Sequence, residues 1–218
     1  RLERLSLPAS PLSETPELEW GRLKGLTHLE YLQCGPAEGL VGVSETLTYL
    51  DLSETLASAT LFVEQLKRWS KLETLMMAKL NCNTTDVPLL LESLQSLSQL
   101  KQVNISHLPV QDDHLSRFLA TVSSWLALRW LNISHFSLTM CPTTVEALMG
   151  ALQGASELAY LYADHPTWDE ECHKCALKAL QGWPRMVMYS LRGSGETSPK
   201  LAKLAAGLQS LLHLSIIL

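Results

Sequence analysis

The chain has 218 residues, a formal net charge of −5 at pH 7 and a sequence pI near 5.8. This acidic balance argues against nucleic acid as a partner, because phosphate binding requires a concentrated basic surface. No apolar run is long enough to cross a bilayer, and the five scattered cysteines lack the terminal clusters of a disulfide-capped secreted protein. We therefore expect a protein of the cytoplasm, or of the nucleus, with no membrane partner.

One apolar spacing, L-x-x-L-x-L, returns along most of the chain, and its clearest copy is Leu128, Leu131 and Ile133. Most copies lie roughly 25 to 30 residues apart, the diagnostic period of leucine-rich repeats. In chain order the copies open at Leu2, Leu29, Leu47, Leu72, Leu100, Leu128, Leu158, Met186 and Leu211. We expect one leucine-rich repeat domain over residues 1–218 with about nine strands. Because both ends lie inside a repeat, we also expect a piece of a longer protein, whose remainder packs on one or both ends.

Helical segments are predicted between most of these strands. In the opening unit Pro8, Pro11 and Pro16 exclude a regular helix, and the second unit is too short to hold one. Apolar residues recur at helical spacing in Thr60 to Ser70, Asp86 to Ser98, Asp112 to Leu126, Thr144 to Gln153, Asp169 to Leu180 and Pro199 to Leu212. Since parallel strands need such crossovers, the predicted fold is α/β: a leucine-rich repeat solenoid, or horseshoe, with a concave parallel sheet and helices on the convex side.

Three tryptophans stand at equivalent places in the repeats. Trp69, Trp125 and Trp183 each lie three residues before the first apolar position of a unit. Side chains of this size are suited to the wedge between a helix and the sheet. We therefore expect a structural role for them rather than stacking on a ligand.

These repeats resemble the helix-bearing leucine-rich repeat domains of the ribonuclease-inhibitor-like type, found in ribonuclease inhibitor, in the C-terminal domains of NOD-like receptors and in the PRAME family. The irregular unit lengths are most similar to the PRAME family. The resemblance implies protein recognition, either of substrates for a ubiquitin ligase or of ligands in an innate-immune receptor. One departure is that Leu80, Leu108 and Phe136 stand where the family often has Asn or Cys. We expect these units to lack the usual side-chain ladder to the loop backbone, and with it tight, regular curvature.

Residues between the apolar frame positions are predicted to face the concave surface, because successive side chains of a strand alternate faces. Trp130, Tyr160 and Tyr162 would form one aromatic patch, edged by Arg129 and Lys101. Tyr and Trp are enriched at binding hot spots, so the patch is predicted to anchor a protein or peptide partner. Cover by another segment of the full-length protein is the other open interpretation. The predicted partner-binding residues are Tyr31, Tyr49, Gln102, Asn104, Arg129, Trp130, Asn132, Tyr160 and Tyr162.

His107, His135 and His165 follow three successive predicted strands at equivalent positions. Stacked imidazoles could bind a metal or respond to pH, because their charge changes in the physiological range. Repeat duplication alone would give the same alignment. No cysteine or carboxylate completes a tetrahedral set in these columns. We therefore predict no metal site, and we favour a pH-sensitive column over metal binding.

Two further kinds of motif receive structural interpretations. Cys172-His173-Lys174-Cys175 contains C-x-x-C, but it lies in a predicted helix without a second half-site, which indicates buried helix cysteines. Asn83-Thr84-Thr85, Asn104-Ile105-Ser106 and Asn132-Ile133-Ser134 match the N-glycosylation pattern, and we interpret them as chance matches. They bear mainly on the alternative function, an extracellular glycosylated leucine-rich repeat receptor ectodomain.

Catalytic signatures are missing from the sequence. Gly193-Ser194-Gly195 has no following Lys and no phosphate-loop length, and no Ser, His and Asp meet at one predicted strand end in convincing order. The predicted function is a non-catalytic protein–protein recognition module that uses its concave surface and needs no cofactor.

Overall fold

The computed structural model describes residues 4–6, 31–33, 45–54, 59, 63–164, 169–181, 183, 185, 188–192 and 213–217, with only the backbone described for 4–6, 31–33, 188–192 and 213–217. The strands form one parallel sheet in sequence order, from β1 to β9. Their bounds are Arg4–Ser6 (β1), Tyr31–Gln33 (β2), Tyr49–Asp51 (β3), Thr74–Met76 (β4), Gln102–Asn104 (β5), Trp130–Asn132 (β6), Tyr160–Tyr162 (β7), Met188–Arg192 (β8) and His213–Ile217 (β9). A strand therefore follows the start of each of the nine predicted copies.

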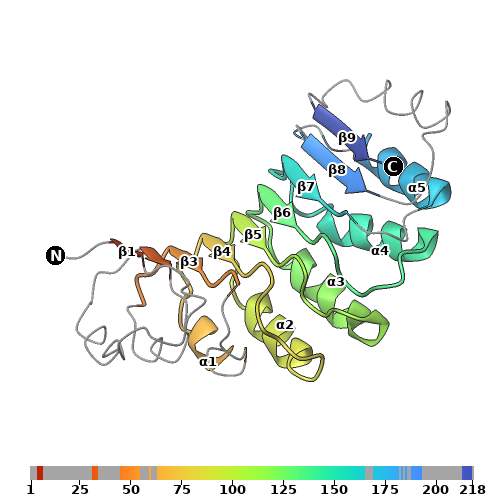
Figure 1. Cartoon of the computed structure of the whole chain (residues 1–218). Helices are drawn as coiled ribbons and strands as arrows, with labels where there is room; N and C mark the ends of the chain where they lie inside the picture. Colours follow the sequence, from red (N-terminus) through yellow and green to blue (C-terminus); the bar gives the residue numbers. More distant parts are fainter. Residues whose placement is uncertain are drawn as a thin grey trace.

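The helices lie on the outer side of a curved ribbon, and the sheet lines its inner side (Figure 1). Their bounds are Val63–Leu66 (α1), Val87–Gln95 (α2), the 3₁₀ turn Asp112–His114 (η4), Leu115–Ser123 (α3), Pro142–Leu152 (α4) and Glu170–Leu180 (α5). The predicted α/β leucine-rich repeat solenoid is confirmed.

The helix predicted over Thr60 to Ser70 ends earlier than expected, because Val63–Leu66 is helical and residues 67–70 are not. Residues 60–62 lie outside the described residues. The segment Pro199 to Leu212 lies outside the described residues. No helix in the described part of the chain combines the length and the apolar character that a membrane span requires.

The core is a strip of apolar frame residues closed on the outer side by the helices. In β6, for example, Leu131 is fully buried between two partly exposed neighbours. The expected wedge residues Trp69 and Trp125 are both buried, and the indole Nε1 of Trp125 donates to the Leu94 carbonyl at 3.1 Å. Trp183 is only partly buried. The structural role of Trp69 and Trp125 is confirmed.

Main-chain hydrogen bonds continue past the strands into the turns that follow. Lys79 N–H donates to the Ser106 carbonyl at 3.0 Å, and His107 N–H donates to the Ser134 carbonyl at 2.9 Å. The residues at this step, Glu54, Lys79, His107 and His135, all have positive φ, between 54° and 63°. We call these four residues the exit row.

The three residues that depart from the family pattern, Leu80, Leu108 and Phe136, follow the exit row directly and are buried. They supply no polar side-chain ladder, as expected. In place of that ladder, backbone hydrogen bonds hold the successive turns in register. The first joins the Glu54 N–H to the Ala78 carbonyl at 2.8 Å, and the last joins the His135 N–H to the Asp164 carbonyl at 2.8 Å. These bonds keep the turns of successive units in register without the ladder, and the expected loss of tight, regular curvature stays a prediction.

The described cysteines Cys82, Cys141, Cys172 and Cys175 are free thiols. Cys172, in the C-x-x-C segment, is buried on α5, and burial raises the pKa of its thiol to about 12. A thiol that resists ionisation is a poor nucleophile and metal ligand. This supports the structural interpretation for Cys172, whereas Cys175 is only partly buried.

Candidate partner-binding surface on the concave sheet

The parallel register aligns the predicted concave residues in two columns. In the first column Gln102, Trp130 and Tyr160 are direct partners on β5, β6 and β7, and Asn104, Asn132 and Tyr162 are partners in the second column. The buried residue between them in each strand points to the core. The register and the burial pattern therefore place these side chains on the face of the sheet opposite the core.

The aromatic residues meet where β6 and β7 pair. The ring centroids of Trp130 and Tyr162 are 5.4 Å apart with an interplanar angle of 47°, a tilted geometry that aromatic pairs favour over a stacked sandwich. Tyr160 pairs with Trp130 in the register and is 38% exposed, one of the few large hydrophobic residues that the described surface leaves open. We call Trp130, Tyr160 and Tyr162 the aromatic patch.

Two other predicted contact residues lie away from this patch. Tyr49 is partly buried on β3, and β4 and β5 separate it from Trp130. Tyr31 is placed on β2 by the register, and its side chain lies outside the described residues. Gln102 is exposed beside Trp130, so it belongs to the surface around the patch.

Asn104 and Asn132 also form side-chain hydrogen bonds within the turns that follow their strands, which the sequence analysis does not predict. Asn104 Oδ1 accepts hydrogen bonds from the backbone N–H and the hydroxyl of Ser106, at 3.1 and 2.8 Å. Asn132 Oδ1 accepts from the Ser134 N–H at 3.0 Å. These are the local turns that Asx side chains favour, so both residues shape the strand exit as well as facing the concave surface. The Asn-x-Ser spacing was the signal that could have indicated this.

The same bonds bear on the glycosylation motifs. Ser106 and Ser134 are each only 5% exposed, and their Asn partners use Oδ1 internally. Asn83, in contrast, is exposed. In two of the three motifs the Ser is therefore buried and the Asn carbonyl oxygen is engaged in the turn, which supports the interpretation as chance matches.

A row of charged residues stands one position before the strands. Glu73, Lys101 and Arg129 precede β4, β5 and β6, and the N–H groups of Lys101 and Arg129 each donate to the preceding member's carbonyl at 2.8 Å. Lys101 Nζ lies 2.7 Å from Glu73 Oε1. Arg129 is exposed and makes no ion pair with any residue that the structure describes. We call these three residues the entry row.

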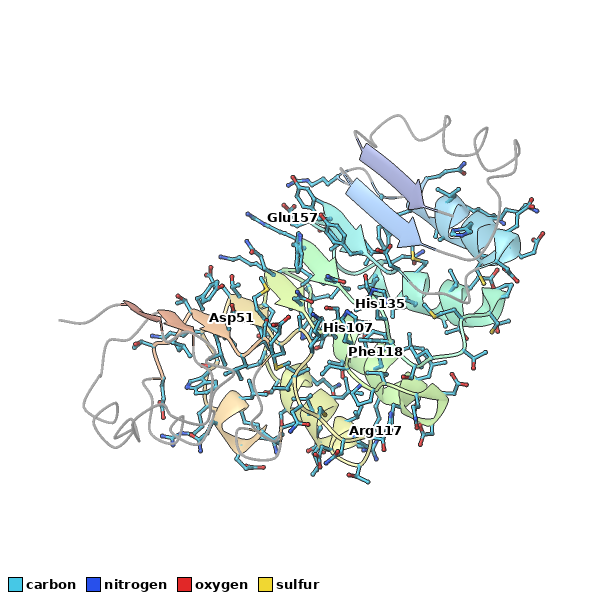
Figure 2. The ribbon with its side chains drawn as sticks, viewed as in Figure 1. Asp51, His107, Arg117, Phe118, His135 and Glu157 are labelled. Carbon is cyan, nitrogen blue, oxygen red and sulfur yellow. The ribbon has the colours of Figure 1, made fainter. Side chains whose placement is uncertain are left out.

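His107 and His135 form a stacked pair at the strand exits (Figure 2), with ring centroids 4.3 Å apart and an interplanar angle of 22°. His165 lies outside the described residues. Within the described ranges no group of three or more His, Cys, Asp or Glu residues could hold a metal ion. The pH-sensitive interpretation stays a prediction, now with the geometry of two of its three members.

The stacked pair gives a testable pH dependence. Burial lowers the pKa of His107 below its ordinary value of 6.5, and the nearby His135 and Lys79 lower it further. As pH falls, the unfolded chain then takes up this proton before the folded chain does. His107 therefore reduces stability below about pH 6.5 and has no effect well above it.

We expect His135→Asn to raise the pKa of His107, because the substitution removes a neighbouring charge and Asn tolerates positive φ. Lys79→Asn should also raise the pKa of His107, because it too removes a nearby positive charge. NMR titration of the His107 imidazole measures both effects. An unchanged titration midpoint in both variants would contradict the assigned coupling.

Comparisons with known proteins add only distant likeness. No protein-family model matches the chain, and no curated protein matches it. Among solved structures, the actin-binding site 2 of leiomodin-1 has 17% identity and a TM-score of 0.49 over 62% of this chain and 80% of that one. The tropomodulin C-terminal domain of Caenorhabditis elegans has 13% identity and a TM-score of 0.47, over 59% and 76%. An internalin of Listeria monocytogenes has 14% identity and a TM-score of 0.45, over 89% and 71%.

Proposed function

We propose that this chain is a non-catalytic module that recognises a protein or peptide partner through its concave sheet. The observation that carries the proposal is the aromatic patch, in which Trp130 contacts Tyr162 and Tyr160 stays open to solvent on the same face. Rigid aromatic side chains offer large apolar area at a small entropic cost, and they dominate the energetics of many interfaces.

Two finer roles are proposals supported by the resemblance in repeat pattern. One is substrate recognition for a ubiquitin ligase, as in PRAME-like proteins, and the other is ligand sensing in a receptor of the NOD-like type. Both place the protein in the cytoplasm or nucleus. Recovery of ligase subunits with the full-length protein, together with ubiquitin on the bound partner, would favour the first role.

The double substitution Trp130→Ala and Tyr160→Ala tests the common proposal. We expect partner binding to weaken by about 30-fold or more, because truncating a hot-spot residue costs at least about 2 kcal/mol. Quantitative affinity capture with wild-type and variant protein as bait measures the loss. Retained binding by a folded double variant would reject the patch as the anchor.

A matched control removes exposed apolar area from the other side of the molecule. Leu89 is 52% exposed on α2, which lies on the outer side of the ribbon (Figure 1). We expect Leu89→Ala to bind the partner as the wild type does. Circular dichroism of all variants separates loss of binding from loss of folding.

A further inference from the structure

The charges of the chain are unevenly placed, and the concave sheet is poor in carboxylates. The whole chain carries a net charge of −5. Of the concave positions on β3 to β7, all within the described part of the chain, only Asp51 is acidic. Its Oδ1 accepts a hydrogen bond from the Ser53 N–H at 2.9 Å. Over β3 to β7 the inner surface of this acidic protein is therefore nearly uncharged.

The entry row adds a cation at the edge of the aromatic patch. Lys101 is neutralised by Glu73 at 2.7 Å. Arg129 has no such neighbour, because the next position in the row is Ala159, whose N–H bonds to the Arg129 carbonyl at 2.9 Å. Arg129 directly precedes Trp130 in the chain. The Arg129 carbonyl also accepts from the Tyr160 N–H at 3.1 Å. The backbone of Arg129 therefore lies beside two members of the aromatic patch, and its exposed side chain has no ion pair within the described residues.

The exit row brings no excess of negative charge to the other edge. Glu54 is paired with Lys79 at 2.9 Å, and the next two members are His107 and His135. Asp164 follows β7 and stands beside His135, whose N–H donates to the Asp164 carbonyl at 2.8 Å. The described residues at both edges of β5 and β6 are therefore neutral or cationic, and the exit of β7 carries one carboxylate, Asp164.

From this distribution we infer that the partner segment is an extended acidic peptide, which places an apolar side chain on the aromatic patch and an adjacent Asp or Glu carboxylate against Arg129. This inference rests on the proposed function and adds the chemistry of the partner. A guanidinium and a carboxylate form two parallel charge-assisted hydrogen bonds. Charge complementarity of this kind gives specificity and faster association.

Selection from a random 12-residue peptide library with the immobilised chain tests the inference. We expect the selected peptides to carry Asp or Glu next to an aromatic or aliphatic residue. Replacing those acids by Asn and Gln should weaken binding about tenfold. Raising the salt concentration should reduce the difference in affinity between the acidic peptides and their Asn and Gln variants.

Charge reversal at the proposed contact provides the second measurement. Arg129→Glu should weaken binding of a selected acidic peptide by about tenfold or more, and a peptide with Lys at the acidic position should recover part of the loss. Arg117→Glu is the matched control, because Arg117 is exposed on α3 at the outer, helical side (Figure 2). We expect it to leave peptide binding unchanged.

The outcomes separate this inference from the proposed function. If the selected peptides bind in a Trp130-dependent way but are neutral or basic, the inference of an acidic partner is wrong and the proposed recognition function is kept. A library without any Trp130-dependent binder would overturn both. Tighter binding of a dT12 oligonucleotide than of the selected peptides, lost in Arg129→Glu, would assign the surface to nucleic acid and overturn the peptide.

Discussion

Trp125→Ala is expected to lower the free energy of unfolding by about 3 to 5 kcal/mol, the range for truncating a fully buried aromatic residue. The indole is completely buried, and its Nε1 donates to the Leu94 carbonyl in α2 at 3.1 Å. Its loss leaves a cavity between two repeats. It also removes one of the hydrogen bonds to the Leu94 carbonyl, which still accepts from the Leu97 N–H at 3.1 Å. Guanidinium denaturation followed by circular dichroism measures the change.

The neighbouring residue supplies the control for this prediction. Leu126 is 61% exposed, so Leu126→Ala should change the free energy of unfolding by no more than about 0.5 kcal/mol. Trp125→Phe should fall between the two, because it keeps most of the apolar volume and loses the hydrogen bond. Equal effects of Trp125→Ala and Leu126→Ala would mean that the wedge is not the structural element described above.

Val103→Asp is expected to reduce the free energy of unfolding by at least about 3 kcal/mol, because it buries an unpaired carboxylate. Val103 is fully buried at the centre of β5. Its neighbour Gln102 is exposed on the concave face, so Gln102→Asp should cost no more than about 1 kcal/mol. The same denaturation experiment compares the two variants.

This pair tests the alternation of faces directly, because both substitutions introduce the same side chain into the same strand one residue apart. A comparable loss for Gln102→Asp would indicate that the inner surface of the sheet is covered rather than open. A small loss for Val103→Asp would contradict the assignment of the core.

The strands and their register can be predicted from the sequence, because the spacing of the leucines marks which residues of each strand are buried. A strand begins two residues after the first position of each predicted frame, including those that open at Leu2 and Met186, and Trp130 pairs with Tyr160 as expected. The helices were less predictable. The helical spacing of Thr60 to Ser70 continues to Ser70, yet the helix ends at Leu66, because short helices depend on tertiary packing more than on local pattern.

The candidate site was predictable in its position and less so in its detail. The aromatic patch follows from strand alternation alone. The tasks of Asn104 and Asn132 in their turns, and the positive φ of His107 and His135, depend on local backbone geometry that hydrophobic periodicity does not report. The difference in charge pairing between Lys101, which pairs with Glu73, and Arg129 follows from the structure and not from the sequence.

The exit row separates the shape of the molecule from its chemistry. Its four members share one backbone conformation and one pattern of main-chain bonds, yet their side chains are a carboxylate, an ammonium and two imidazoles. Because backbone conformation and main-chain hydrogen bonds hold these turns in place, the side chains of the exit row can differ in charge from one repeat to the next without changing how the repeats pack. Such a scaffold can acquire a new binding preference by single substitutions while its architecture stays constant.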